Sequence, residues 1–188
     1  MRLISLVIGA VVLSGCASVN NSQPVSDNGV TGWTVVGEDI WQTHNGVTTA
    51  SANPGKSYLV SAKQYSNFRL ALEFMPDAEV NSGVFVNCAD NQKIGSKVCY
   101  EANISDNHKK PEFRTGSIVR HAKPSVKVDT IGKWNKMIFT VADGQATVNI
   151  NGVVTAQASA AKHPSGHIGL QRFKAGVIKF RNIQITPL

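Results

Sequence analysis

Short runs of alternating apolar and polar residues fill the chain from Gly32 onward, and turn-forming residues separate the runs. Such alternation is typical of β-strands that bury one face. Dipeptides that favour two-residue hairpin loops stand between several of the runs: Asn45-Gly46, Asp143-Gly144 and Asn151-Gly152. Both residues of such a loop adopt positive φ, which Asn, Asp and Gly tolerate best. No run has the period of an amphipathic helix over three turns.

The pattern therefore predicts an all-β domain over residues 32–188, with many short strands and close turns. A chain of this kind folds as a sandwich or a barrel. Besides the runs that flank the three hairpin dipeptides, we predict strands at 57–62, 67–74, 82–88, 99–105, 115–119, 136–141, 167–173 and 177–185.

Alternation also assigns a face to each polar residue within these strands. Glu101, for example, lies opposite Tyr100 and Ala102. Polar side chains of four strands lie opposite the apolar set in this way: Glu73, Asn87, Glu101, Asn103 and Gln171. If the four strands are neighbours in one curved sheet, these groups line a polar concavity that suits sugar hydroxyls, with an aromatic platform such as Phe85. A plain solvated face of an outer sheet explains the same alternation, so the pattern alone leaves both interpretations open.

Composition and charge narrow the class of protein. The chain has 188 residues, of which 42% are hydrophobic and 16% charged, and it contains 16 glycines. This length suits one domain with a substantial core, and the composition excludes intrinsic disorder and a coiled coil. The 19 Lys and Arg against 12 Asp and Glu give a net charge of +7, but the cations are scattered, with Lys109-Lys110 as the densest point. Binding of nucleic acid needs a basic stripe with interleaved aromatic residues, so we expect no nucleic-acid partner.

The N-terminus predicts export and lipid attachment. Arg2 precedes an apolar stretch over residues 3–13, which is shorter than the ~20 residues that span a bilayer and fits a signal peptide. The following Leu13-Ser14-Gly15-Cys16 resembles a bacterial lipobox, whose cysteine is lipidated after cleavage. We therefore expect a signal peptide over 1–15, a lipidated Cys16 with a flexible tether over 16–31, and the domain over 32–188. Ala17 and Ser18 resemble a sorting signal for the outer membrane, facing the periplasm. An ordinary signal peptide with an incidental cysteine is the alternative.

The other two cysteines, Cys88 and Cys99, form an even pair in a chain expected to be exported. In an oxidising compartment such a pair forms a disulfide by default, and two free buried thiols are the alternative. We expect no metal site at these cysteines, because no His or Cys stands beside them at ligand spacing. The five histidines show no metal-ligand spacing either.

Several motifs stand in a fixed order along the folded part of the chain: Asn81-Ser82-Gly83-Val84-Phe85, Tyr100-Glu101 with Asp106 downstream, Thr115-Gly116-Ser117-Ile118, Trp134-Asn135, Asn151-Gly152, Gly166-His167-Ile168-Gly169-Leu170-Gln171 and Phe180-Arg181-Asn182-Ile183. In these motifs the chain resembles the 3-keto-disaccharide hydrolase domain family over residues 32–188. The resemblance implies a concanavalin A-like jelly-roll sandwich of two antiparallel sheets with a concave side that faces sugar. It also allows a divalent metal, although the sequence shows no set of ligands for one.

The resemblance further implies action on glycosides that are oxidised at C3. A 3-keto group acidifies the proton on C2, so a carboxylate base can break the glycosidic bond by elimination, and water adds afterwards. Glu101 is the expected base or orienting carboxylate, and Glu73 is the second candidate. The expected substrate-binding residues are Asn81, Asn87, Asn103, Asp106 and Gln171.

The chain also departs from the family pattern. Asn87 stands where relatives carry Arg, and Phe173 stands where they often carry His. One expectation is therefore a lipid-anchored hydrolase or lyase of 3-keto-glycosides, which the retained Glu101 and Gln171 favour. The alternative is a non-catalytic carbohydrate-binding or envelope-associated lipoprotein, which the two departures favour.

Overall fold

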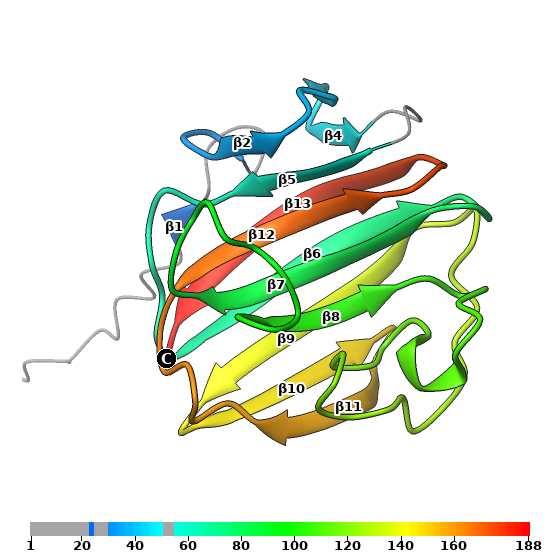
Figure 1. Cartoon of the computed structure of the whole chain (residues 1–188). Coiled ribbons are helices and arrows are strands. Elements are labelled where there is room, and N and C mark those ends of the chain that lie inside the picture. Colours follow the sequence, from blue (N-terminus) through cyan, green and yellow to red (C-terminus); the bar gives the residue numbers. More distant parts are fainter. Residues whose placement is uncertain (1–22, 25–29, 51–54) are drawn as a thin grey trace, which may run out of the picture.

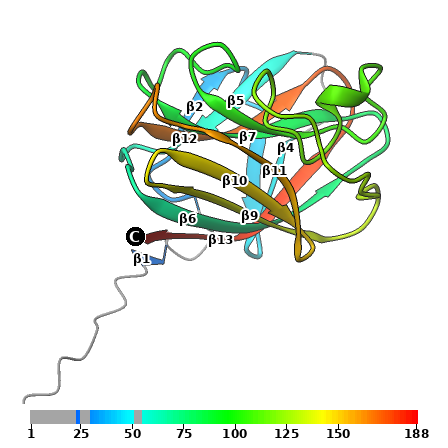
Figure 2. The same cartoon turned by 90° about the horizontal axis from the view of Figure 1, so that it is seen from below.

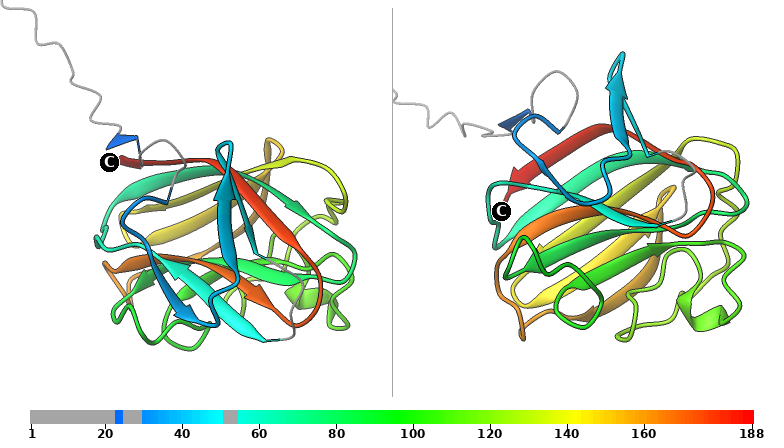
Figure 3. Two further views of the ribbon diagram at one scale, coloured as in Figure 1. Left: turned by 90° about the horizontal axis from the view of Figure 1, so that it is seen from above. Right: turned by 45° about the horizontal axis from the view of Figure 1, so that its top comes forward.

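The computed structural model describes residues 23–24, 30–50 and 55–188. The predicted signal peptide and Cys16 lie outside the described residues. The described part contains β-strands and a single short 3-10 helix, η1 (Pro111–Phe113). None of its helices is long and apolar enough to cross a membrane. The strands form two antiparallel sheets that stack face to face (Figures 2 and 3), so the predicted all-β jelly-roll sandwich is confirmed.

One sheet has eight strands and the other has five. The eight-stranded sheet runs in the order β11 (Val153–Ser159), β10 (Gln145–Ile150), β9 (Asn135–Ala142), β6 (Phe68–Pro76), β13 (Ile178–Pro187), β4 (Val47–Ala50) and β3 (Trp41–His44), with β1 (Gln23–Pro24) paired to β13. The five-stranded sheet runs in the order β2 (Thr34–Gly37), β5 (Lys56–Val60), β12 (His167–Phe173), β7 (Asn81–Cys88) and β8 (Tyr100–Ile104). Figure 1 shows the strands and labels all of them except β3.

The predicted hairpins are present. The turns between β3 and β4, β9 and β10, and β10 and β11 each place two residues at positive φ, for example 50° at Asp143 and 71° at Gly144. The strand predicted at 115–119 is wrong, because this segment forms isolated bridges instead of a ladder. Gly116 has a φ of 88°, which breaks the extended backbone. The segment still bonds the outer edge of β8: the Val119 amide donates to the Glu101 carbonyl at 2.9 Å.

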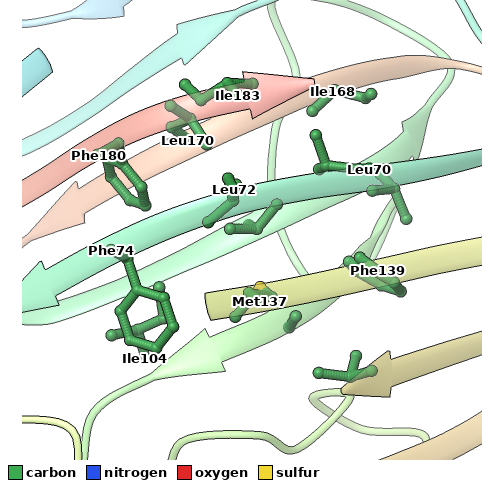
Figure 4. Packing of buried hydrophobic residues seen from close by; sticks show 14 of the residues in the cluster. Leu70, Leu72, Phe74, Ile104, Met137, Phe139, Ile168, Leu170, Phe180 and Ile183 are labelled. Atoms are coloured by element: carbon green, nitrogen blue, oxygen red, sulfur yellow. The ribbon is translucent and has the colours of Figure 1, made fainter. Parts of the chain in front are cut away.

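The core between the sheets determines which side chains point outward. Alternate residues of β6 and β9 face the core from the eight-stranded sheet, and alternate residues of β12 and β8 face it from the other sheet (Figure 4). The fully buried residues among them include Leu70, Leu72, Phe74, Met137, Phe139, Ile168, Leu170 and Ile104. Each such side chain contributes about 1.5–3 kcal/mol by leaving water, so a one-residue slip of a strand is strongly disfavoured. The intervening residues of β12 and β8 therefore face away from the core.

A second, smaller apolar cluster lies on the outer side of the five-stranded sheet. Cys88 and Cys99 form a disulfide there, as predicted, at the ends of β7 and of the loop 89–98. Ile94 of this loop is 7% exposed and packs with Phe85 and Val60 in this cluster. Figure 2 shows the loop, in green, on the side of the sheet that faces away from the other sheet. The disulfide and Ile94 thus hold the loop against the outer face.

Candidate functional site

The outer face of the five-stranded sheet carries the candidate site, and the register of the strands aligns its residues. Gln171 on β12 pairs with Tyr58 on β5 and with Gly83 on β7. Gly83 in turn pairs with Asn103 on β8. Directly paired residues share a face of the sheet, so the side chains of Tyr58, Gln171 and Asn103 form one row.

Glu101 lies in a neighbouring row of the same face. Phe85 on β7 pairs with Gly169 on one side and with Glu101 on the other. The side chain of Glu101 leans over Gly83: a Cβ atom added at Gly83 would lie 2.9 Å from Oε1 and 3.1 Å from Cγ of Glu101. The missing side chain at position 83 therefore makes room for the carboxylate between the two rows.

Two segments on the outer side of the sheet enclose a cavity of about 300 Å³ over these rows, which lies within the range of small-ligand sites. The loop 89–98 supplies one wall, and the segment 105–122 supplies another. The lining residues are Lys56, Tyr58, Asn81, Phe85, Gly95, Ser96, Glu101, Asn103, His108, Phe113, Val119, Arg120, Gln171 and Phe173.

Glu101 is the buried carboxylate of this cavity. Its exposed fraction is 7%. Burial raises the pKa of the Glu101 carboxyl to about 7, although a hydrogen bond with Ser96 and the charges of Lys56 and Arg120 lower it. Near neutral pH the group therefore exists in both protonation states, which suits a general base or acid. Burial raises this pKa, and Glu73 makes no contribution to it.

Of the two amides beside Glu101, Gln171 is only partly satisfied. Gln171 donates from Nε2 to the Tyr58 hydroxyl at 3.3 Å, while no described residue donates a hydrogen bond to its buried Oε1. Asn103 donates from Nδ2 to the carbonyl of Phe113. A buried acceptor without a donor is costly, so Gln171 Oε1 is a place where a ligand hydroxyl would donate.

Glu73 does not join this site, and its expected position beside Glu101 is wrong. It lies on β6, in the eight-stranded sheet, between β9 and β13. Its side chain accepts a hydrogen bond from Arg181 Nε at 2.7 Å, and this bond lowers the pKa of Glu73. Alternation correctly predicts that Glu73 points away from the core. A sandwich has two outer faces, however, and Glu73 lies on the outer face of the eight-stranded sheet.

Asn87 and Asp106 also lie outside the cavity. At Asn87 the φ is 54°, and the register of β7 and β12 shifts before Cys88. This bulge interrupts the alternation, and the Asn87 side chain donates to the carbonyl of His163 at 2.5 Å. Asp106 accepts hydrogen bonds from the hydroxyls of Thr115 and Thr130 at 2.5 and 2.7 Å, so it ties two loop segments together.

The structure thus brings together four of the expected site residues, namely Asn81, Glu101, Asn103 and Gln171. Tyr58 belongs to the site as well, and alternation in the predicted strand 57–62 could have identified it. Further polar and aromatic lining residues come from strand ends and loops, where alternation in the sequence does not indicate which way a side chain points. These include Lys56, Ser96, His108, Phe113 and Arg120.

The residues of the cavity do not fit a divalent metal. Such cations take several oxygen or nitrogen ligands, and no group of three or more His, Cys, Asp or Glu in the described ranges is placed to hold one. Glu101 is the one carboxylate among the described lining residues, and Lys56 and Arg120 put positive charge near it.

Comparisons with known proteins agree with this picture. A family model described as a 3-keto-alpha-glucoside-1,2-lyase-like domain matches residues 22–186. A structure from Parabacteroides distasonis ATCC 8503, described as a "putative glycosyl hydrolase", is 27% identical with a TM-score of 0.71, covering 80% of this chain and 91% of that chain. Carbohydrate binding module CBM66 from Bacillus subtilis is 16% identical with a TM-score of 0.66, covering 84% of this chain and 96% of that chain, and so shares the fold. No curated protein sequence matches the chain.

Proposed function

The chain belongs to the 3-keto-alpha-glucoside-1,2-lyase-like domain family, and from this premise we propose that it cleaves glycosides oxidised at C3. The observation that carries the proposal is Glu101, a carboxylate that is 7% exposed in a ligand-sized cavity and has a pKa of about 7. A base of this pKa is half ionised at neutral pH and is strong enough to take an acidified carbon-bound proton.

The proposed reaction starts at C2 of the sugar. Glu101 takes the C2 proton, and the electron pair of the C–H bond moves into an enolate on the C3 oxygen. The pair then forms the C1–C2 double bond while the bond from C1 to the aglycone oxygen breaks, and that oxygen takes up a proton from water. Addition of water across C1 and C2 completes hydrolysis, and without this step the enzyme is a lyase.

Neighbouring side chains have distinct roles in this proposal. Gln171 Oε1, which lacks a described donor, accepts a hydrogen bond from a sugar hydroxyl and positions the ring. Lys56 and Arg120 lie close enough to lower the pKa of Glu101. The same positive charges stabilise the enolate when negative charge passes from the carboxylate to the substrate. Asn103, held by the Phe113 carbonyl, fixes one wall of the cavity.

A second candidate function is carbohydrate binding without catalysis. Phe173 lines the cavity at a position where the family resemblance suggests a histidine. An aromatic ring beside amides suits a sugar that is bound and released unchanged. The two candidates differ in whether Glu101 exchanges a proton with the ligand.

We also propose that the chain is anchored to the outer membrane through a lipid on Cys16. The support is the four-residue lipobox after an apolar stretch of signal-peptide length.

Turnover of 3-keto-disaccharides by the full chain tests the proposed activity. We expect release of the two monosaccharides, detected by NMR, and a loss of at least about 100-fold in Glu101→Gln, which keeps the shape but removes the base. Glu73→Gln is the matched control, because it changes a glutamate on the other outer face and should keep activity. If the chain binds the sugars without turnover, carbohydrate binding is the function. If Glu101→Gln stays fully active, the assigned base is wrong.

A further inference from the structure

The cavity that holds Glu101 adjoins a second hollow at the end of the sandwich. This hollow has a volume of about 360 Å³ and shares two lining residues, Asn81 and His108, with the first cavity. Its walls come from three connections that meet at this end: 77–80 after β6, 105–110 after β8, and Lys174 after β12. The two hollows are therefore neighbours, and we refer to them together as the groove, with Glu101 in its first part.

The second hollow is lined by three exposed lysines, Lys109, Lys110 and Lys174. Within the described ranges, none of the three lies within ion-pair distance of an acidic residue, whereas Lys93 and Lys127 elsewhere each pair with an aspartate. Glu79 is the acidic residue that lines this hollow. Over the whole groove, five Lys or Arg side chains face two glutamates, so the groove attracts anions.

Two of the three lysines contact aromatic rings at the junction of the two hollows. The Lys110 ammonium lies 5.7 Å from the ring centre of Phe113, and the Lys174 ammonium lies 5.7 Å from that of Phe173. Both rings line the first hollow. Cation–π contacts of this length are attractive, so two of the charges stand where a ligand would pass from one hollow to the other.

The backbone at Lys174 supports a role beyond solubility. Its φ is 68°, in the left-handed region that Gly, Asn or Asp occupies with less strain. Strained non-glycine residues persist where the surroundings or a function retain them. A lysine at this turn position costs stability and places its ammonium beside Phe173.

Resting on the proposed function, we propose that the lysine-lined hollow is a subsite for an anionic group on the part of the glycoside that leaves. A neutral sugar needs no net charge in its site, whereas a carboxylate, sulfate or phosphate would neutralise Lys110 and Lys174. The substrate class is then a 3-keto-glycoside with an acidic aglycone, such as a uronic acid or a sulfated or phosphorylated sugar.

The test compares matched 3-keto-disaccharides whose aglycone is neutral or carries a carboxylate, sulfate or phosphate. With the full chain at low salt we expect a KM about tenfold lower for acidic aglycones, from two charge-assisted contacts, and the difference should shrink at high salt. The double variant Lys110→Gln with Lys174→Gln should bring the KM values of the acidic and neutral substrates within about twofold of each other. Lys93→Gln with Lys127→Gln is the matched control and should keep the preference.

Binding of unoxidised acidic and neutral disaccharides, measured by calorimetry, separates this inference from the proposed activity. Selective binding of the acidic sugars without turnover of any 3-keto-glycoside would support the subsite and overturn the lyase. Turnover with equal KM for acidic and neutral substrates would support the lyase and overturn the subsite. A preference that survives the Lys110 and Lys174 changes would also overturn it, and the carboxylate, sulfate and phosphate arms show which acid the hollow selects.

Discussion

Gly83→Ala tests whether the position of the Glu101 carboxylate controls activity. The added Cβ would lie 2.9 Å from Oε1 and 3.1 Å from Cγ of Glu101, and 3.3 Å from the carbonyl oxygen of Ala102. An ordinary contact starts near 3.4 Å, so the carboxylate has to move by about 0.5 Å or more. The backbone oxygen blocks an easy shift of the strand, and the side chain of Glu101 must give way.

The expected loss follows from this displacement. A misplacement of about 1 Å costs on the order of 100-fold in rate, so we expect kcat/KM of Gly83→Ala to fall by about 10- to 100-fold. Stability should change less, because replacing a strand glycine gains about 0.5–1 kcal/mol, while overpacking costs about 1–3 kcal/mol. Activity should therefore drop in a protein that still unfolds cooperatively near the wild-type temperature.

Gly169→Ala provides the matched control. Gly169 lies on the same face, one strand away, and its added Cβ would meet Ile94, Phe85 and Val60 at 3.4–3.9 Å, which are ordinary contacts. Its kcat/KM toward 3-keto-disaccharides should stay near wild type. Full activity in Gly83→Ala, with thermal unfolding unchanged, would refute the reasoning that a glycine is needed there to seat Glu101.

The remaining predictions concern titration, the disulfide and the anchor. The rate should rise with pH through about 7 as Glu101 ionises, and Lys56→Met should shift this rise to higher pH, because the lysine charge lowers the pKa. The raised folded pKa means that stability is lost as pH increases from about 4.5 to 7, so Glu101→Gln should be more stable by up to about 3 kcal/mol at pH 8 and no more stable at pH 4, measured by urea unfolding. Replacing Cys88 and Cys99 by serine should lower the free energy of unfolding by about 2–3 kcal/mol; an unchanged urea midpoint would contradict this. Cys16→Ser should move the protein from the membrane to the soluble fraction, and full retention in membranes would disprove the lipid anchor.

Local patterns in the sequence identified strands and the direction of their side chains. Alternation in 100–104 placed Glu101 and Asn103 opposite the core residues Ala102 and Ile104, because successive residues of a strand point to opposite faces. The Asn-Gly and Asp-Gly turns were equally local, since they depend on the φ that two residues tolerate. These features required no knowledge of which strands are neighbours.

Only the tertiary structure decided which outward residues meet. Glu73 and Glu101 show the same alternation, but β6 and β8 belong to different sheets, and the order of strands depends on pairings between residues far apart in the chain. The bulge at Asn87 arises from its pairing with β12, so alternation alone could not reveal it.

The raised pKa of Glu101 likewise depends on the tertiary structure. An isolated glutamate in a strand has a pKa near 4.5, and nothing in the residues beside Glu101 predicts another value. The shift to about 7 arises because the loop 89–98 and the segment 105–122 enclose the carboxylate and remove the water that would stabilise its charge. The sequence by itself therefore determined that Glu101 faces outward, whereas folding of distant loops over the sheet made it a buried base.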